Sequence, residues 1–384
     1  MGRTILMNIL TFLLLFKILN EKRRILMRTH KNELTILIVM LSNLHVLAVS
    51  FMAIGKPPGF ISNASGISTN YTVVGDGERS NWIWTTGTYS LGPGPIVDIS
   101  EDGSIMIANV NSGGGDGFYK VVHDAVQTIG GYAHGFNKVK AISSDGSKIV
   151  GDTDINNSDQ HPAWSYQNGV YTILPLPTGF TGDARAEAIS SNGTVIAGNI
   201  QSHNSDITET VLWQNGYIEI LPNPENVTFS QVLEIAGNGS VIVGFYRDTN
   251  IARACVWQNG MIETLPMLTG VTNSIATGSS FDGSIIFGNF LEGPGTGFSP
   301  IGAFIWDELN GTRLLKDFLE NDYGLDLTGW NLLSVSATDA SGNIITGYGI
   351  NPQGQEELWI ATIPEPGTII LFVVGGLMLQ RKRI

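Results

Sequence analysis

The sequence is poor in cysteine and in basic residues. Cys255 is the only cysteine in 384 residues, so no disulfide can form within the chain. It lies in the apolar segment Ala254–Trp257, where a buried, inert thiol is a better interpretation than a reactive one. Between residues 51 and 380, eleven Lys or Arg stand against 32 Asp or Glu, a net charge of about −21. A surface of this sign repels phosphate backbones, which argues against nucleic acid as a partner and leaves divalent cations or cationic partners open.

Side chains that commonly carry metal or catalytic chemistry are few and scattered. The expected mature chain has four histidines, none with a second His at metal-binding spacing, and no Cys partners them: His123, His134, His161 and His203. We therefore do not expect zinc. Asp152-x-Asp154-x-Asn156 begins like a calcium loop, but the positions that require Gly and an acid hold Asn157 and Ala163, so a polar surface loop is favoured over calcium. We find no catalytic constellation and assign no catalytic, cofactor or metal residue.

Glycine is abundant, with 47 residues, and the stretch from Ala188 to Pro222 shows its use. The pattern predicts four short strands joined in pairs by Asn192-Gly193 and Asn215-Gly216: Ala188–Ser190, Thr194–Gly198, Thr210–Gln214 and Tyr217–Leu221. Asn-Gly between apolar runs is a strong hairpin signal, because a type I′ turn needs positive φ at both central residues. Two hairpins make one four-stranded antiparallel sheet.

This block recurs along the chain. The first turn carries a Gly, usually after Asp or Asn and once after Ser341, and the turn glycines are Gly103, Gly146, Gly193, Gly239, Gly283 and Gly342. An aromatic residue anchors the third strand of each copy: Trp84, Tyr119, Trp164, Trp213, Trp257, Trp306 and Trp359. With a degenerate first copy that ends at Gly75, we count seven copies, mostly 43–47 residues apart. We interpret the repeated acids as turn residues rather than catalytic groups.

A repeat of this length with four strands per copy predicts an all-β fold, a β-propeller of seven four-stranded antiparallel blades. Six or eight blades are the alternatives. The recurrent Trp residues are expected to pack between blades rather than form a ligand platform. The last copy ends at Ile363 without its fourth strand, so we predict that an N-terminal strand, Phe51–Ile54 or Phe60–Ser62, completes the seventh blade. Apolar residues at helical spacing predict one short helix in the insertion Asn310–Leu333.

The repeats resemble the bacterial extracellular repeats named after the tripeptide His-Ala-Phe. Ala141-Ile142-Ser143-Ser144-Asp145-Gly146 and Ala303-Phe304-Ile305-Trp306 match the pattern of that family well, although the naming His is absent before Ala303. The resemblance covers roughly Ile67–Ile363 and implies an extracellular repeat domain without a defined activity.

The N-terminal 50 residues are typical of a targeting region. From Met27, which is a candidate initiator, Arg28 and Lys31 form a positive segment, Leu34–Leu47 an apolar segment, and Ala48-Val49-Ser50 a small-residue cleavage site. We predict cleavage after Ser50, which leaves a repeat domain over 51–363. The alternative is an uncleaved anchor or a long signal.

Residues 364–384 form a second signal. Pro364-Glu365-Pro366 opens it, an apolar run over Thr368–Leu379 follows, and Arg381-Lys382-Arg383 closes it. The run is shorter than the ~20 residues that span a bilayer comfortably, but the terminal bases favour a membrane segment with its end in the cytoplasm. The three parts together resemble the PEP-CTERM sorting signal. That resemblance implies processing by an exosortase of a Gram-negative bacterium, after which the tail is removed; the alternative is a plain tail anchor.

These features predict an exported monomer, held at the inner membrane as an intermediate and then delivered to the cell surface or extracellular matrix. The expected function is a non-catalytic scaffold associated with exopolysaccharide or biofilm, and the alternative is a secreted polysaccharide hydrolase or lyase with a site at the propeller channel. Carboxylates with perturbed pKa values in that channel would favour the enzyme. Because the repeated residues build the scaffold, recognition is expected in the loops that do not repeat: Asn111–Gly117, Asp152–Gln160, Gln201–Glu209 and Asn310–Leu333.

Overall fold

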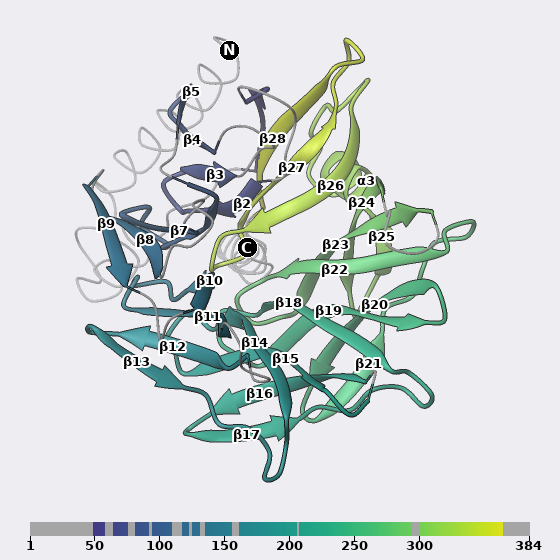
Figure 1. Ribbon diagram of the computed structural model, residues 1–384. Coiled ribbons are helices and arrows are strands. Elements are labelled where there is room, and N and C mark those ends of the chain that lie inside the picture. Colours follow the sequence, from purple (N-terminus) through teal and green to yellow (C-terminus); the bar gives the residue numbers. More distant parts are fainter. Residues whose placement is uncertain are drawn as a thin grey trace, which may run out of the picture. The chain divides into compact units, whose positions relative to one another are not determined.

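Short apolar strands separated by Gly-containing turns dominate the chain, and they fold into successive four-stranded antiparallel sheets, two of which are joined by the parallel pair Thr208↔Phe229 (Figure 1). The structure, a computed structural model, describes residues 49–57, 64–75, 81–91, 94–109, 117–122, 125–130, 135–155, 161–205, 207–293 and 299–363. The chain divides into two units, Met1–Leu47 and Ala48–Ile384, and every described residue belongs to the second. The targeting region up to Ala48, the alternative closing strand Phe60–Ser62 and the tail 364–384 lie outside the described residues.

Seven blades follow one another, each listed from its inner to its outer strand. Blade one consists of β2 (Ala64–Ile67), β3 (Val73–Gly75), β4 (Trp82–Thr85) and β5 (Thr88–Leu91). Blade two consists of β6 (Ile96–Ile99), β7 (Ile105–Asn109), β8 (Gly117–Val122) and β9 (Ala125–Gly130). Blade three consists of β10 (Gly135–Ile142), β11 (Lys148–Ile155), β12 (Ala163–Gln167) and β13 (Val170–Ile173). Blades four and five are β14 (Gly182–Ile189), β15 (Val195–Ser202), β16 (Thr208–Gln214), β17 (Tyr217–Ile220); and β18 (Phe229–Ile235), β19 (Val241–Asp248), β20 (Ile251–Gln258), β21 (Met261–Thr264). Blade six is β22 (Asn273–Ser279), β23 (Ile285–Glu292), β24 (Ser299–Asp307), β25 (Gly311–Leu314), and blade seven combines β26 (Asn331–Thr338), β27 (Ile344–Ile350), β28 (Glu356–Thr362) and β1 (Ser50–Gly55). The predicted seven-bladed propeller is confirmed.

The inner strands form a closed ring. They contact one another in the order β2, β6, β10, β14, β18, β22 and β26, and β26 contacts β2. Backbone hydrogen bonds join the first turns of successive blades as well: the amide of Glu101 donates to Ser144 O (3.0 Å), that of Ser144 to Ser191 O (3.1 Å), and that of Ser191 to Gly237 O (2.9 Å). The same type of bond links Thr69 with Glu101, Asn238 with Phe281 and Phe281 with Ser341. Each first turn is thus held by its neighbour.

The predicted N-terminal closure is also confirmed. β1 pairs antiparallel with β28 over Ser50↔Thr362 to Gly55↔Leu358. The Phe51 ring stacks on Trp359 at 5.8 Å between centroids and meets Trp330 edge-on at 5.1 Å, while Ile54 is buried. The predicted cleavage after Ser50 would remove only the first residue of β1 and leave the Phe51↔Ala361 pair.

The two turns of a blade differ, which corrects the prediction of a type I′ turn at Asn192-Gly193. Only the second turn has positive φ at both central residues, as at Asn215 (54°) and Gly216 (80°). In the first turn Gly193 alone is positive (70°). The Asn192 side chain caps this turn instead, accepting hydrogen bonds from the amide of Thr194 (3.0 Å) and the hydroxyl of Ser190 (3.0 Å). The flanking strands are longer than predicted, Gly182–Ile189 and Val195–Ser202.

The same cap explains the one copy that has Ser before its turn Gly. In blade three Asp145 Oδ1 accepts from the Ser143 hydroxyl (2.7 Å) and the Ser147 amide (2.9 Å). In blade seven the two residue types exchange places: the Ser341 hydroxyl donates to Asp339 Oδ2 (2.6 Å), and the Ile344 amide donates to Asp339 Oδ1 (2.8 Å). The Ser and the acid are hydrogen-bonded to each other in both blades, and either residue can come first in the turn.

In most copies a second Gly, five residues after the turn Gly, makes room between strands for the blade's aromatic residue, whereas blade two has Ala108 there. A Cβ added at Gly198 would lie 1.9 Å from the carbonyl oxygen of Arg185 and 2.9 Å from the Trp213 ring. Trp213 then reaches the previous blade, where its Nε1 donates to Pro175 O (2.8 Å), and Trp257 donates to Pro222 O in the same way (2.9 Å). Trp164, Trp213, Trp257 and Trp359 are buried, whereas Trp306 is half-buried and Phe304 takes the buried position in blade six.

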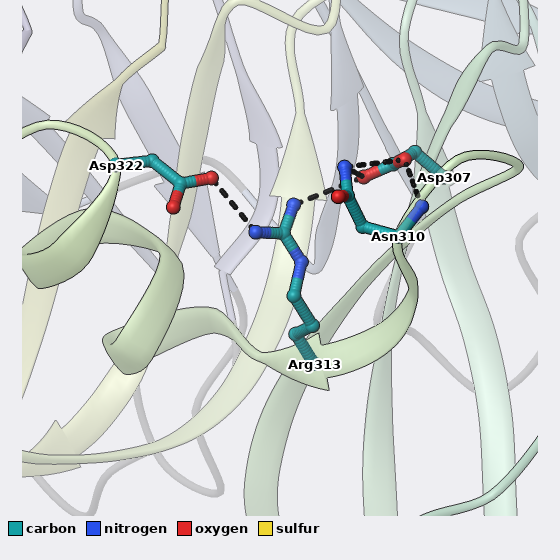
Figure 2. A network of polar contacts seen from close by, with 4 residues as sticks. All are labelled: Asp307, Asn310, Arg313 and Asp322. Atoms are coloured by element: carbon teal, nitrogen blue, oxygen red, sulfur yellow. Dashed lines mark hydrogen bonds and ion pairs between the residues drawn. The ribbon is translucent and has the colours of Figure 1, made fainter.

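The insertion before blade seven folds against blade six. Its helix, α3 (Leu315–Asn321), buries Leu315, Phe318 and Leu319, as the helical spacing predicts. Figure 2 shows the polar network that fixes it: Arg313 of β25 reaches Asp322 after the helix (2.7 Å) and Asp307 of β24 (3.0 Å). Asp307 also accepts hydrogen bonds from the backbone and side-chain nitrogens of Asn310. Among the described residues no helix is long and apolar enough to cross a bilayer.

Candidate functional site

The central channel holds a cavity of about 180 Å³ that is lined by residues of all seven inner strands. Each inner strand contains a β-bulge at the same level, seen as a register shift against its partner. A bulge inserts one unpaired residue and re-aims the side chains around it, and bulges are common near binding and active sites. The bulged residues are Ser65, Val97, Lys140, Glu187, Leu233, Thr277 and Ser336.

The residue after each bulge is small in five blades and acidic in two. The small ones are Gly66, Ala141, Ala188, Gly278 and Ala337, and the acids are Asp98 and Glu234. The carboxylates occupy space that neighbouring glycines leave free: a Cβ added at Gly66 would lie 3.2 Å from Asp98 Oδ1, and one added at Gly278 would lie 3.3 Å from Glu234 Oε2. These two departures from the repeat are the sequence signal that would have identified the acids of the channel.

Asp98 has an unusually basic carboxylate. Burial raises its pKa to about 7, against the lowering effect of backbone hydrogen bonds from Ile142 (3.0 Å to Oδ2) and Ile99 (2.8 Å to Oδ1). The side chain retains some surface toward the channel although protein surrounds it on other sides. It is therefore protonated in part of its population near neutral pH.

Glu234 lies within electrostatic reach of Asp98. Burial raises its pKa well above the usual value, and the negative charges of Asp98 and Asp339 act in the same direction, while the hydroxyl of Thr338 donates to its carboxylate (3.2 Å to Oε2) and opposes the shift. Two carboxyl groups with raised pKa values thus face one channel, which is an arrangement expected of an enzyme site.

A wall of charge lies on blades three and four. The Lys140 ammonium binds Glu187 across the two blades at 2.9 Å. Asp152 of β11 is buried nearby; desolvation raises its pKa, and Lys140 gives the largest opposing effect. Lys138 and Arg185 precede the bulges of β10 and β14 and are exposed. Sequence reasoning missed this wall, because channel-facing positions depend on where each bulge lies.

His161 and His203, about one repeat apart in the sequence, meet at Asp183. Nδ1 of His161 and Nε2 of His203 each lie 3.0 Å from Asp183 Oδ1. The cluster ties the segment before β12 to the loop after β15, which lies within the predicted recognition loop Gln201–Glu209. Within the described ranges, no group of three His, Cys, Asp or Glu side chains is arranged to hold a metal ion. The pairing escaped the sequence because adjacent blades, not local spacing, bring the histidines together.

The residues singled out from the repeat lie in turns and blade interfaces. The turn glycines Gly146, Gly193, Gly239, Gly283 and Gly342 have φ of 68° to 77°, which a side chain would strain. Of the loops expected in recognition, Asn310–Leu333 is fully described and borders a cavity of about 340 Å³ lined by Leu268, Arg313 and Phe318, among others. Asp152 of the calcium-like segment lies buried in β11, and residues 156–160 fall outside the described part of the chain. The sorting residues Pro364, Glu365, Pro366, Arg381, Lys382 and Arg383 also fall outside it.

Solved structures share the propeller architecture. An oligogalacturonate lyase from Vibrio parahaemolyticus aligns with a TM-score of 0.50 and 12% identity, covering 83% of this chain and 98% of that one. The β-propeller domain of the trilobed protease from Pyrococcus furiosus aligns with a TM-score of 0.50 and 10% identity, covering 80% of this chain and 94% of that one. No protein-family model matches the chain, and no curated protein matches it either. At these identities the likeness establishes the fold alone.

Proposed function

We propose that this chain is an exported protein of a Gram-negative cell surface or extracellular matrix, and that its propeller is a non-catalytic scaffold that binds exopolysaccharide. The observation that carries the binding role is the channel, where Asp98, Lys140 and Glu187 are held by structural contacts. Asp98 accepts two backbone amides, and Glu187 is paired with Lys140. Groups held in this way can present fixed hydrogen-bond partners to a saccharide without having to exchange protons with it.

Glycan retention tests the binding role. The protein recovered from its host is applied to an array of acidic and neutral glycans, and we expect retention on at least one class. The Gly347→Ala chain, in which the added Cβ would lie 1.8 Å from Ser334 O, should not fold stably and serves as the control for retention by unfolded protein. No retention on any glycan would refute the binding role.

Export and sorting rest on the N-terminal pattern and on the PEP-CTERM resemblance. In this proposal an exosortase removes the tail near Pro364–Pro366, after the inner membrane has held the chain as an intermediate. Mass spectrometry of the protein from an exosortase-bearing host should show a C-terminus near those residues and an N-terminus at Phe51. An intact tail that ends at Ile384 would refute sorting without touching the binding role.

The raised pKa values in the channel favour a second candidate, a polysaccharide hydrolase or lyase. A carboxyl group whose pKa is about 7, as at Asp98, can donate or accept a proton at neutral pH. Glu234 would be the second ionisable group. Incubation with acidic and neutral polysaccharides, followed by measurement of new reducing ends and unsaturated sugars, should detect cleavage that Asp98→Asn abolishes. No product from any polysaccharide would remove this candidate.

A further inference from the structure

At two levels of the inner strands, the charged side chains lie on blades three and four alone among the described residues. At the bulge and at the position two residues before it, the described inner-strand residues include four charged side chains: Lys138 and Lys140 of β10, and Arg185 and Glu187 of β14. The remaining described residues at these two levels are uncharged: Ser65, Pro95, Val97, Gln231, Leu233, Ile275, Thr277, Ser334 and Ser336. The wall therefore carries three bases and one acid at these levels, in a domain whose net charge is strongly negative.

Two of the bases are open to a ligand. Glu187 neutralises Lys140 at 2.9 Å, and the pair is mostly shielded from solvent, with 29% and 14% of the two side chains exposed. Lys138 and Arg185 stand at equivalent positions of adjacent blades, since Lys138 pairs with Asp152 and Arg185 with Asn199 in matching register. Both are exposed, and in the described part of the chain no hydrogen bond or ion pair engages either side chain. Each is close enough to Asp152 to act on its pKa, so the two cations share one locality.

Two cations side by side repel each other, and an anion placed between them relieves that repulsion. A guanidinium binds a carboxylate in a two-pronged geometry, and an ammonium adds a point charge beside it. At the same levels, blade five, next to blade four, offers the amide of Gln231, and blade seven offers the hydroxyl of Ser336. A ligand with a carboxylate on one side and hydroxyl groups on the other fits this division.

We propose that the inner-strand surface of blades three and four, beside the channel, binds a carboxylate of an acidic oligosaccharide, with Lys138 and Arg185 as the residues that select acidic over neutral sugars. This inference rests on the proposed glycan-binding function and names its ligand class. Glu187 acts as a positioning residue, because its ion pair with Lys140 holds that ammonium away from the ligand. The same pair lowers the positive charge of the wall and so limits its non-specific attraction of anions.

The test uses the purified full-length chain and oligosaccharides of equal length. Titration with an oligomer of galacturonic acid should give binding that weakens as salt rises, and a neutral oligomer should bind at least about tenfold more weakly. Arg185→Gln and Lys138→Gln should each weaken binding of the acidic oligomer by about tenfold, the effect expected for one charge-assisted hydrogen bond. The matched control is Arg253→Gln, which removes the same charge from β20 near its partner Asp248 and should leave binding unchanged.

The outcomes separate the two claims. Equal affinity for acidic and neutral oligomers, or affinities of Arg185→Gln and Lys138→Gln that match Arg253→Gln, would overturn the carboxylate site and leave glycan binding standing. Displacement of the acidic oligomer by inorganic phosphate at equal concentration would overturn the assignment to an acidic sugar. Binding of neither oligomer would overturn both the site and the proposed function. Because Lys138 and Arg185 are exposed, we expect both variants to keep the thermal midpoint of the unmodified protein.

Discussion

The substitution Asp98→Asn should change the dependence of stability on pH. The folded-state pKa of Asp98 is about 7 and the ordinary value is 3.8, so between these limits the folded protein binds a proton that the unfolded chain has lost. Stability is therefore highest below the ordinary pKa and falls as pH rises toward 7. A shift of this size corresponds to about 4 kcal/mol as an upper limit, at about 1.4 kcal/mol per pH unit.

Asparagine cannot ionise, so it removes the loss of stability that accompanies ionisation of Asp98, but it weakens the hydrogen bonding of the site. Its oxygen can accept the Ile99 amide, whereas its NH₂ group would meet the Ile142 amide, which now donates to Oδ2 at 3.0 Å. One lost hydrogen bond and two opposed donors cost about 1–3 kcal/mol at any pH. Asp98→Asn should thus be less stable than the unmodified protein at about pH 5 and as stable or more stable at about pH 8.

Chemical denaturation at several pH values measures this change, and blade three supplies the control. Asp145→Asn changes the same residue type in the first turn of blade three. In the first turn of blade four, Asn192 already occupies the equivalent position and makes the equivalent hydrogen bonds. Hydrogen bonds from Ser143 and Ser147 lower the pKa of Asp145, so it is ionised throughout this range and its substitution should leave the slope unchanged. Asp339, with a pKa raised to about 6 by burial, and Glu234 preserve part of the slope in Asp98→Asn. Equal slopes in Asp98→Asn and the unmodified protein would refute the reasoning.

Three further substitutions test the fold. Phe51→Ala removes the ring that packs on Trp330 and Trp359, and should lower the free energy of unfolding by about 2–3 kcal/mol because Phe51 is half-buried; the exposed Val170→Ala is its control, and equal loss in the two would contradict closure by β1. Gly347→Ala would place a Cβ 1.8 Å from Ser334 O and should prevent stable folding, whereas Gly130→Ala meets nothing within 4 Å and should fold normally, as circular dichroism can show. Arg313→Ala leaves Asp307 and Asp322 without their shared cation and should increase proteolysis of the insertion, with about 1–2 kcal/mol of lost stability; unchanged cleavage would contradict a clamping role.

The repeat made the architecture predictable because its signals are local and recur. The blade count, the antiparallel order and the closing strand all follow from the spacing of Gly and Trp and from the unmatched strands at the two ends. The type of the first turn could not be read in this way. Asn-Gly satisfies two different turns, and the choice at Asn192 depends on Ser190, whose hydroxyl competes for the Asn side chain.

The candidate site was less accessible to sequence reasoning. Whether Lys140 and Glu187 face the channel depends on the bulge in each inner strand, and a bulge reverses the alternation of every side chain beyond it. Asp98 and Glu234 were nevertheless visible in principle, because they stand where five other copies carry Gly or Ala. The meeting of His161 and His203 at Asp183 required knowing which blades adjoin.

The pairing of β1 with β28 in blade seven has a mechanical consequence. β1 and β28 run antiparallel, and Ser50 is paired with Thr362, so the chain enters and leaves the propeller at the same end of one strand pair. A force that draws the two ends apart would load the Ser50↔Thr362 pair first and then each following pair in turn, which is an unzipping geometry that yields at low force. Within the other six blades, covalent turns connect all four strands. Tension on the chain ends would therefore peel β1 away before it strained the inner-strand ring.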